Sequence, residues 1–302
     1  MSPRLFVPIL SPYASYFLMR GEFVDVGGAR LYCYASGSRG AGIPIVLVHG
    51  AFTSSHLWRE LLPRLPQGHR VLVLDLLGHG RSDRPTNFSM TVAGHAERLL
   101  GLLNELAVSS ACMVGHGLGA AVAVHLAHSA PTRVAKLALV NPALLASHPK
   151  DLLIPRVFRR LSLLIPVWKK LPADWLASAL HTALVRGYAQ RSAGAHSVDF
   201  YLKPFRNREG RDAACLQLQA LKRSSFDTVT ALAPASLRPC VSVVVGEDDP
   251  FLQPQRAERV LHTLQLATES RAVVHRLSGV AHVAPEEAPD RLAAIIGELL
   301  TQ

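Results

Sequence analysis

Short apolar runs that alternate with helical segments are the feature that most constrains the fold of this chain. Residues 43–48 and 71–74 are almost continuously apolar, which is typical of strands buried on both faces of a parallel sheet. Parallel strands need crossover connections, which helices usually provide. The pattern predicts a short helix over 55–65, a helix over 91–106, a strand over 111–114, a helix over 118–128 and a strand over 136–140. The sequence therefore predicts an α/β fold.

Two further patterns surround this alternation. Residues 22–26 and 30–35 flank Gly27-Gly28 and predict a hairpin with a two-residue turn. The strand and helix pattern stops at Asn141-Pro142, and the stretch that follows has helical spacing without a strand-like run. The pattern then resumes with a predicted strand over 241–245, a helix near 255–264, a strand over 272–277 and a closing helix over 285–300.

A glycine-rich turn joins the predicted strand 111–114 to the next helix. Residues 114–119 read Val-Gly-His-Gly-Leu-Gly. Such a turn projects its central position above the sheet, and small residues at Gly115 and Gly119 let strand and helix approach closely. In this chain the central residue, Gly117, has no side chain to project.

The hairpin, the parallel sheet, this turn and the helical insertion together resemble an α/β-hydrolase with an α-helical cap. The resemblance extends from about Glu22 to the C-terminus. It implies a mostly parallel sheet flanked by helices, with the cap inserted after the sixth strand. The expected organisation is an N-terminal extension (1–21), a core (22–141 and 235–302) and a helical cap (142–234).

By this resemblance, position 117 is that of the catalytic nucleophile. Glycine enters the strained backbone region of such a turn freely. It also removes the attacking atom, a change that lowers turnover by about 10⁶ in a triad enzyme and leaves roughly 10³–10⁴ over water. Covalent acyl-enzyme catalysis at Gly117 is thereby excluded.

The same resemblance implies a His–Asp dyad. Asp249 follows the strand 241–245 in the family's G-x-x-D form, although Asp248 stands beside it, and His282 follows the last strand on a short loop. In such a dyad the aspartate fixes the histidine tautomer and stabilises its protonated form.

The resemblance further implies main-chain oxyanion donors at Ala51 and Leu118, which the loss of a serine side chain does not remove. Four residues are expected at the substrate pocket: His49, Phe52, His116 and Trp168. The alternative for His49 is an imidazole that only packs in a tight turn. We expect no cofactor, and the histidine spacing gives no metal site.

Three functions stay open. The dyad can act without a covalent step on a hydrophobic ester, lactone or acyl compound. The chain can instead be a pseudo-hydrolase that binds a ligand or serves as a scaffold. It can also be a serine hydrolase variant whose nucleophile was removed, by drift or by design.

The charge of the chain is concentrated in the insertion. The net charge is +10, and residues 142–234 hold fourteen Lys and Arg against six Asp and Glu. Nucleic-acid binding is not expected, since no recognised motif accompanies the basic residues. A tryptophan, basic pairs and apolar residues over 154–171 suit either an anionic membrane surface or a cap that solvates its charges.

The remaining features indicate a cytoplasmic protein, with membrane association left open. The N-terminal apolar run, residues 5–19, contains Pro8 and Pro12 and is too short and broken to span a bilayer. The cysteines lack metal spacing and suggest small buried side chains in a reducing compartment. The sequence indicates no oligomeric state.

Overall fold

A mixed sheet of eight strands forms the centre of the computed structural model, which describes residues 21–37, 42–142, 156–223, 240–251 and 272–302. The strands lie in the order β1-β2-β4-β3-β5-β6-β7-β8, and all neighbours from β4 onward pair in parallel. Their bounds are β1 Glu22–Asp25, β2 Arg30–Ser36, β3 Ile45–Val48, β4 Val71–Leu74, β5 Ala111–His116, β6 Val134–Val140, β7 Cys240–Gly246 and β8 Ala272–Leu277. The predicted mostly parallel α/β sheet is confirmed.

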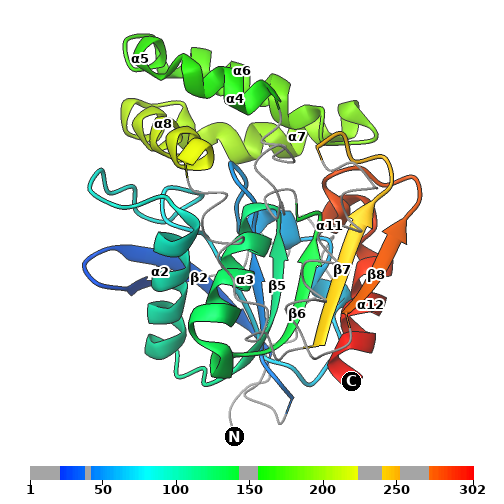
Figure 1. Cartoon of the computed structure of the whole chain (residues 1–302). Coiled ribbons are helices and arrows are strands. Elements are labelled where there is room, and N and C mark those ends of the chain that lie inside the picture. The colour runs from blue at the N-terminus through cyan, green and yellow to red at the C-terminus, as the bar shows by residue number, and fades with distance from the viewer. Residues whose placement is uncertain (1–20, 38–41, 143–155, 224–239, 252–271) are drawn as a thin grey trace, which may run out of the picture.

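The apolar runs occupy the middle of the sheet because helices cover both of its faces. Every residue of β3, β4 and β5 is buried. Helices α2 (Val92–Glu105) and α3 (Leu118–Ser129) cover one face, and α12 (Pro289–Thr301) lies on the other (Figure 1). The predicted hairpin is also present as antiparallel β1 and β2, with Gly27 and Gly28 at positive φ in the turn.

Two predicted helices are broken in the structure, and proline accounts for the break in the second. Residues 55–65 form two 3₁₀ turns, η1 (Ser55–Trp58) and η2 (Leu62–Arg64), and Pro63 lies in the first turn of the second. The closing helix is divided into α11 (Ala284–Glu287) and α12, because Ala288 before Pro289 adopts φ −143° and ψ 53°. A residue that precedes proline is disfavoured in the α region.

A second layer of helices lies over the carboxyl ends of the strands (Figure 1), and its role as the predicted cap stays a prediction. We call residues 156–223 the helical layer. It consists of α4 Arg156–Leu163, α5 Ile165–Trp168, α6 Ala173–Val185, α7 Arg191–Leu202, η5 Lys203–Phe205 and α8 Arg208–Arg223. The predicted cap boundaries adjoin or fall within segments 143–155 and 224–239, which lie outside the described residues, as does the helix predicted near 255–264.

The described part of the chain contains no helix long and apolar enough to cross a bilayer.

Candidate active site

The turn between β5 and α3 has the geometry that the sequence predicts. Gly117 caps α3 with φ 52° and ψ −110°, and its N–H donates to the carbonyl of Val140, 3.1 Å away. A Cβ on Gly115 would lie 2.4 Å from the carbonyl oxygen of Gly119, and one on Gly119 would lie 2.1 Å from that of Val48. Both flanking positions therefore require glycine for the close approach of strand and helix.

Gly117 differs from Gly115 and Gly119 because the space next to it is open. A Cβ at this position would lie 3.7 Å from the Cα of Gly50 and 3.7 Å from Nε2 of His282, and both are ordinary van der Waals distances. The turn thus directs position 117 toward the histidine ring, and a small side chain would fit.

His282 and Asp249 lie together at the carboxyl ends of the strands. Nδ1 of His282 is 2.8 Å from Oδ2 of Asp249, and the carboxylate is fully buried. Burial by itself raises the pKa of Asp249, but the charge of His282 and the hydrogen bonds to the carboxylate bring that pKa below its ordinary value. The aspartate is therefore ionised at neutral pH and holds the histidine with Nδ1 as the donor and Nε2 toward Gly117.

Asn141 supports this pair and was missed by the sequence analysis. Its amide Nδ2 donates to Oδ2 of Asp249 at 2.8 Å and to the carbonyl of Ala281 at 2.9 Å. The residue is fully buried and has φ 43°, a conformation that asparagine tolerates better than most residues. Its position at the end of a buried strand was the available signal.

The predicted oxyanion donors flank the same space. Leu118 is the first residue of α3, so its N–H lies at the open end of the helix. Ala51 follows Gly50, whose Cα lies within contact distance of a side chain at position 117. Their role as oxyanion donors stays a prediction.

His49 is fixed by the backbone, and its predicted place at the substrate pocket stays a prediction. It is fully buried, its Nε2 accepts from the N–H of Leu76 at 2.9 Å, and its Nδ1 donates to the carbonyl of Gly50 at 2.7 Å. Burial lowers its pKa. Both ring nitrogens are occupied by the backbone, which agrees with the alternative of an imidazole packed in a tight turn.

His116 contacts His282 of the candidate dyad. Its Nε2–H donates to the carbonyl of His282 at 2.9 Å, and the two ring centroids are 4.8 Å apart. Burial, followed by the charge of His282, lowers the pKa of His116 to about 3, so its imidazole is neutral. His116 therefore holds the backbone of the His282 loop.

The other two predicted pocket residues link to the helical layer. Phe52 is buried at φ 59° and stacks on Phe158 of α4 with ring centroids 5.5 Å apart. Trp168 is half-buried, and its indole N–H donates to the carbonyl of Leu161 within the layer. Both roles in substrate binding stay predictions.

The helical layer contacts the His282 loop directly. The N–H of His282 donates to the carbonyl of Gly187 at 2.8 Å, and a Cβ on Gly187 would lie 3.0 Å from the Phe251 ring. The Phe251 ring packs edge-on against His282 with centroids 4.9 Å apart. Gly187 and Phe251 were not predicted from sequence, because neither belongs to a local motif.

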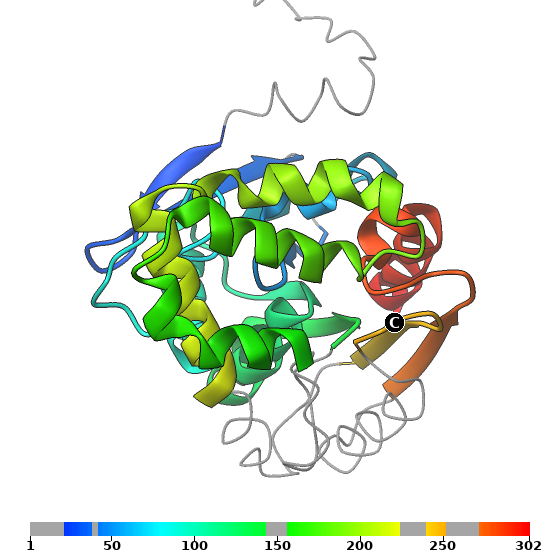
Figure 2. The same cartoon turned by 90° about the horizontal axis from the view of Figure 1, so that it is seen from above.

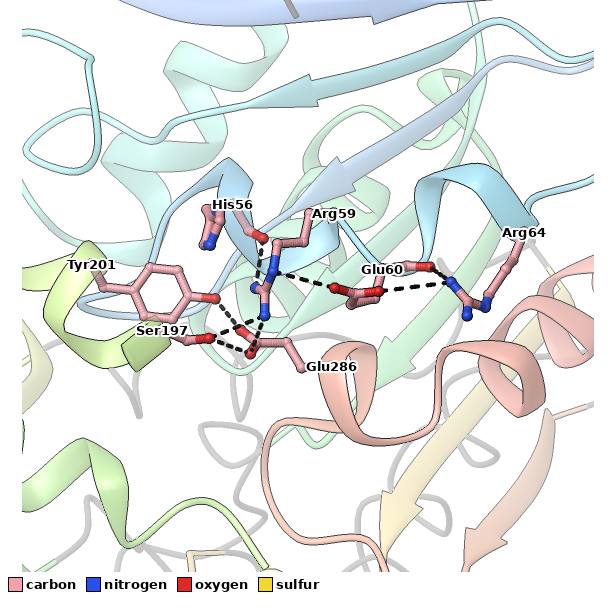
Figure 3. A network of polar contacts seen from close by, with 7 residues as sticks. All are labelled: His56, Arg59, Glu60, Arg64, Ser197, Tyr201 and Glu286. Atoms are coloured by element: carbon pink, nitrogen blue, oxygen red, sulfur yellow. Dashed lines mark hydrogen bonds and ion pairs between the residues drawn. The ribbon is translucent and has the colours of Figure 1, made fainter. Parts of the chain in front are cut away.

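Two glutamates of α11 fasten the layer to the core. Glu287 accepts from the N–H of Ala189 at 2.7 Å and from that of Ala281 at 2.9 Å. Glu286 is buried and joins core to layer, as Figure 3 shows. Its carboxylate accepts from Arg59 at 2.9 Å, from Ser197 at 2.8 Å and from Tyr201.

A cavity of about 520 Å³ adjoins these glutamates. Its wall is largely charged and polar, so it does not suit the hydrophobic ligand expected from the sequence. The wall includes Arg59, Glu60, Arg64, Tyr188, Gln190 and Glu286. The described residues contain no cluster of side chains that could hold a metal ion.

Residues 43–259 match the sequence model of the α/β-hydrolase fold. The chain belongs to this family. It is 32% identical over 126 residues to 2-hydroxymuconate semialdehyde hydrolase of Pseudomonas sp. (strain CF600), an alignment that covers 41% of this chain and 44% of that enzyme. Alignments with several curated relatives span 30% to 44% of those relatives' length. The activity and substrates of the whole protein therefore stay proposals.

Solved α/β-hydrolase structures agree over nearly the whole chain. Cfl2 from Burkholderia cenocepacia is 25% identical, with a TM-score of 0.76 over 93% of this chain and 95% of that one. The enol-lactonase from Burkholderia xenovorans LB400 has a TM-score of 0.74 over 93% of this chain and 100% of its own, at 22% identity, and shows the fold alone. Family membership and the hydrolase names of relatives agree with the expectation of an enzyme.

Proposed function

We propose that this α/β-hydrolase hydrolyses a hydrophobic ester, lactone or related acyl compound with a His282–Asp249 dyad and without a covalent intermediate. The single observation that carries the proposal is the open space between Gly117 and Nε2 of His282, where a side-chain Cβ would lie 3.7 Å from that nitrogen. A water molecule in this space would occupy the place of the missing nucleophile.

The proposed reaction uses the water oxygen as nucleophile. Nε2 of His282 takes a proton from the water, while Nδ1–H donates to the ionised Asp249 at 2.8 Å. The water oxygen bonds to the substrate carbonyl carbon, and the N–H groups of Ala51 and Leu118 stabilise the developing oxyanion. When the tetrahedral intermediate collapses, the carbon–oxygen bond to the leaving group breaks and Nε2 returns the proton to that oxygen.

The magnitude of this catalysis limits the substrate. General acid–base catalysis supplies about 10²–10⁴-fold. Substrates with good leaving groups, such as activated esters and enol lactones, therefore suit the dyad better than amides do. Phe52, Phe158 and Phe251 lie in a row of aromatic contacts that ends at His282, and this row favours an apolar substrate.

A second function is supported by the fit of a side chain at position 117. Because a Cβ there meets nothing closer than 3.7 Å, the site accommodates the serine of an ordinary triad. The chain would then be a hydrolase that has lost its nucleophile, and it would retain binding without turnover.

Turnover of activated esters of short and long acyl chain tests both functions. The unmodified chain is compared with Gly117→Ser, and His282→Ala is made in each background to exclude a contaminating esterase. Turnover by the unmodified chain that His282→Ala abolishes supports the non-covalent dyad. Activity in Gly117→Ser alone supports loss of the nucleophile. If neither protein turns over any ester but both bind one in calorimetry, the chain is a binding protein and the proposal is wrong.

A further inference from the structure

The helical layer carries an exposed apolar patch. Six large hydrophobic side chains are exposed in the described residues, and four of them lie within residues 163–175. These four, which we call the apolar patch, are Leu163 (61% exposed), Leu164 (45%), Val167 (47%) and Trp175 (61%). Scattered exposed side chains are ordinary, but a concentration of this kind marks an interaction surface.

The patch residues belong to elements of the helical layer that lie far from the sheet. Leu163 ends α4, Val167 lies in α5, and Trp175 lies in the first turn of α6. These elements are at the outer edge of the molecule in Figure 1, and in the view from above in Figure 2 no other described segment lies over them. The patch is therefore accessible to a large flat partner.

Basic residues are frequent in the sequence around the patch. Residues 156–175 contain five Lys and Arg and one acidic residue, Asp174. Lys169 and Lys170 are exposed and form no ion pair within the described part of the chain. Asp174 is paired with Arg206 at 3.5 Å. The surface therefore combines apolar groups with the positive charge of Lys169 and Lys170.

We propose that the apolar patch and its lysines dock this chain on an anionic phospholipid surface. Leucine and valine side chains gain free energy when they enter the acyl boundary, tryptophan prefers the interface itself, and lysine binds anionic headgroups. The short helices α4 and α5 would lie in the plane of the surface. The charge selects lipid over a second copy of this chain, because two patches of the same sign repel.

The apolar residues also select lipid over nucleic acid. Leu163, Leu164 and Val167 offer no hydrogen bond to a phosphate or a base, whereas all three can be buried among acyl chains. The docking is independent of the proposed function, since it needs no residue near His282. If both hold, an apolar substrate can partition into the bilayer beside the helical layer.

Vesicle flotation of the full chain tests the proposal. Neutral phosphatidylcholine vesicles are compared with vesicles that contain phosphatidylserine. We expect binding to the anionic vesicles that decreases with salt. Lys169→Gln/Lys170→Gln should weaken the partition coefficient about fivefold per charge removed, and Leu163→Ser/Leu164→Ser should weaken it about tenfold or more.

Matched controls carry the same chemical changes elsewhere. Arg186→Gln/Arg191→Gln removes two exposed charges near the start of α7, and Phe23→Ser removes an exposed ring from β1. Both should bind vesicles like the unmodified chain. Tryptophan emission gives an independent readout, because Trp58 is fully buried, Trp168 is half-buried with its indole N–H bonded to Leu161, and Trp175 is 61% exposed. Vesicles should shift the emission to the blue, and Trp175→Phe should remove most of that shift.

Several results would overturn the proposal. One is an absence of binding to anionic vesicles. Another is binding that the control variants reduce as much as the patch variants do. A concentration-dependent dimer that Leu163→Ser/Leu164→Ser abolishes would identify a second copy as the occupant. If a nucleic-acid column retains the lysine variant and the arginine control variant equally, the binding reflects the general basicity of the chain.

Discussion

The N–H of His282 donates to the carbonyl of Gly187, 2.8 Å away, so the helical layer holds the backbone of the candidate catalytic histidine. The contact is reinforced by Glu287, which accepts from Ala189 on the layer and from Ala281 next to the histidine. The helical layer is consequently part of the framework of the site as well as its cover. Substitutions in this contact should change the site without touching the dyad.

Glu287→Gln should loosen the layer and the His282 loop together. A carboxylate accepts both N–H groups, whereas an amide offers one acceptor oxygen, so one N–H loses its partner at about 0.5–1.5 kcal/mol. We expect faster hydrogen exchange at Ala189 and Ala281 and a lower free energy of unfolding. Glu298→Gln on the exposed face of α12 is the control. Unchanged exchange at both amides would contradict the bridging role.

Gly119→Ala should prevent folding, whereas Gly117→Ala should be tolerated. A Cβ at position 119 would lie 2.1 Å from the carbonyl oxygen of Val48, but one at position 117 meets nothing closer than 3.7 Å. Gly117→Ala still adopts φ 52° and ψ −110°, a sparsely populated conformation that costs about 1–3 kcal/mol. Soluble yield and thermal unfolding measure both variants. Equal melting temperatures would show that strand and helix can separate more easily than this packing indicates.

Asn141→Ala should destabilise the chain and misalign Asp249. The substitution removes two buried hydrogen bonds, each worth about 1 kcal/mol or more. Asn141→Gly is the matched variant, because it removes the same side chain but relieves the φ of 43°. Urea unfolding should therefore rank the native chain above Gly and Gly above Ala.

The same two variants separate positioning from stability. If Asn141 orients the dyad, both should lower kcat in the Gly117→Ser background with little change in KM. A decrease in stability with unchanged kcat would restrict Asn141 to a structural role.

Acid should destabilise the fold through histidines buried in the neutral form. Burial, the first cause in each case, lowers the pKa of His95 to about 4 and those of His56 and His116 to about 3. An unfolded chain takes up these protons near its ordinary pKa of about 6.5, so this stability is full above that pH and is lost as pH falls toward 4 and 3. At pH 5 each of these histidines should lower the free energy of unfolding by about 2 kcal/mol relative to its value above pH 6.5.

Urea unfolding between pH 7.5 and 5 measures this loss. His95→Gln removes one titrating group and should flatten the pH dependence relative to the native chain. His69→Gln is a control on a half-buried histidine whose Nδ1 lies 2.8 Å from the carbonyl of Ile43. A native free energy of unfolding that is constant over this pH range would contradict the prediction.

Part of the candidate site could be predicted from local patterns. Buried strands appear as apolar runs, and the residues just beyond their carboxyl ends meet at one edge of a parallel sheet. Asp249, His282 and the turn at Gly117 each follow such a run, so the sequence already indicated that they share an edge. The break at Pro289 was missed because helical spacing was given more weight than the effect of proline on the preceding residue.

The sequence by itself determined the sheet, the hairpin, the glycine turn and the absence of a nucleophile at position 117, because each is encoded by neighbouring residues. Only the tertiary structure decided that Asn141 supports Asp249, that His49 is enclosed by the backbone, and that Gly187 and Glu287 hold the His282 loop. Asn141 is 108 residues from Asp249, and Glu287 is 98 residues from Ala189. Periodicity describes which face of an element is buried, but the packing of distant elements decides which side chains meet there.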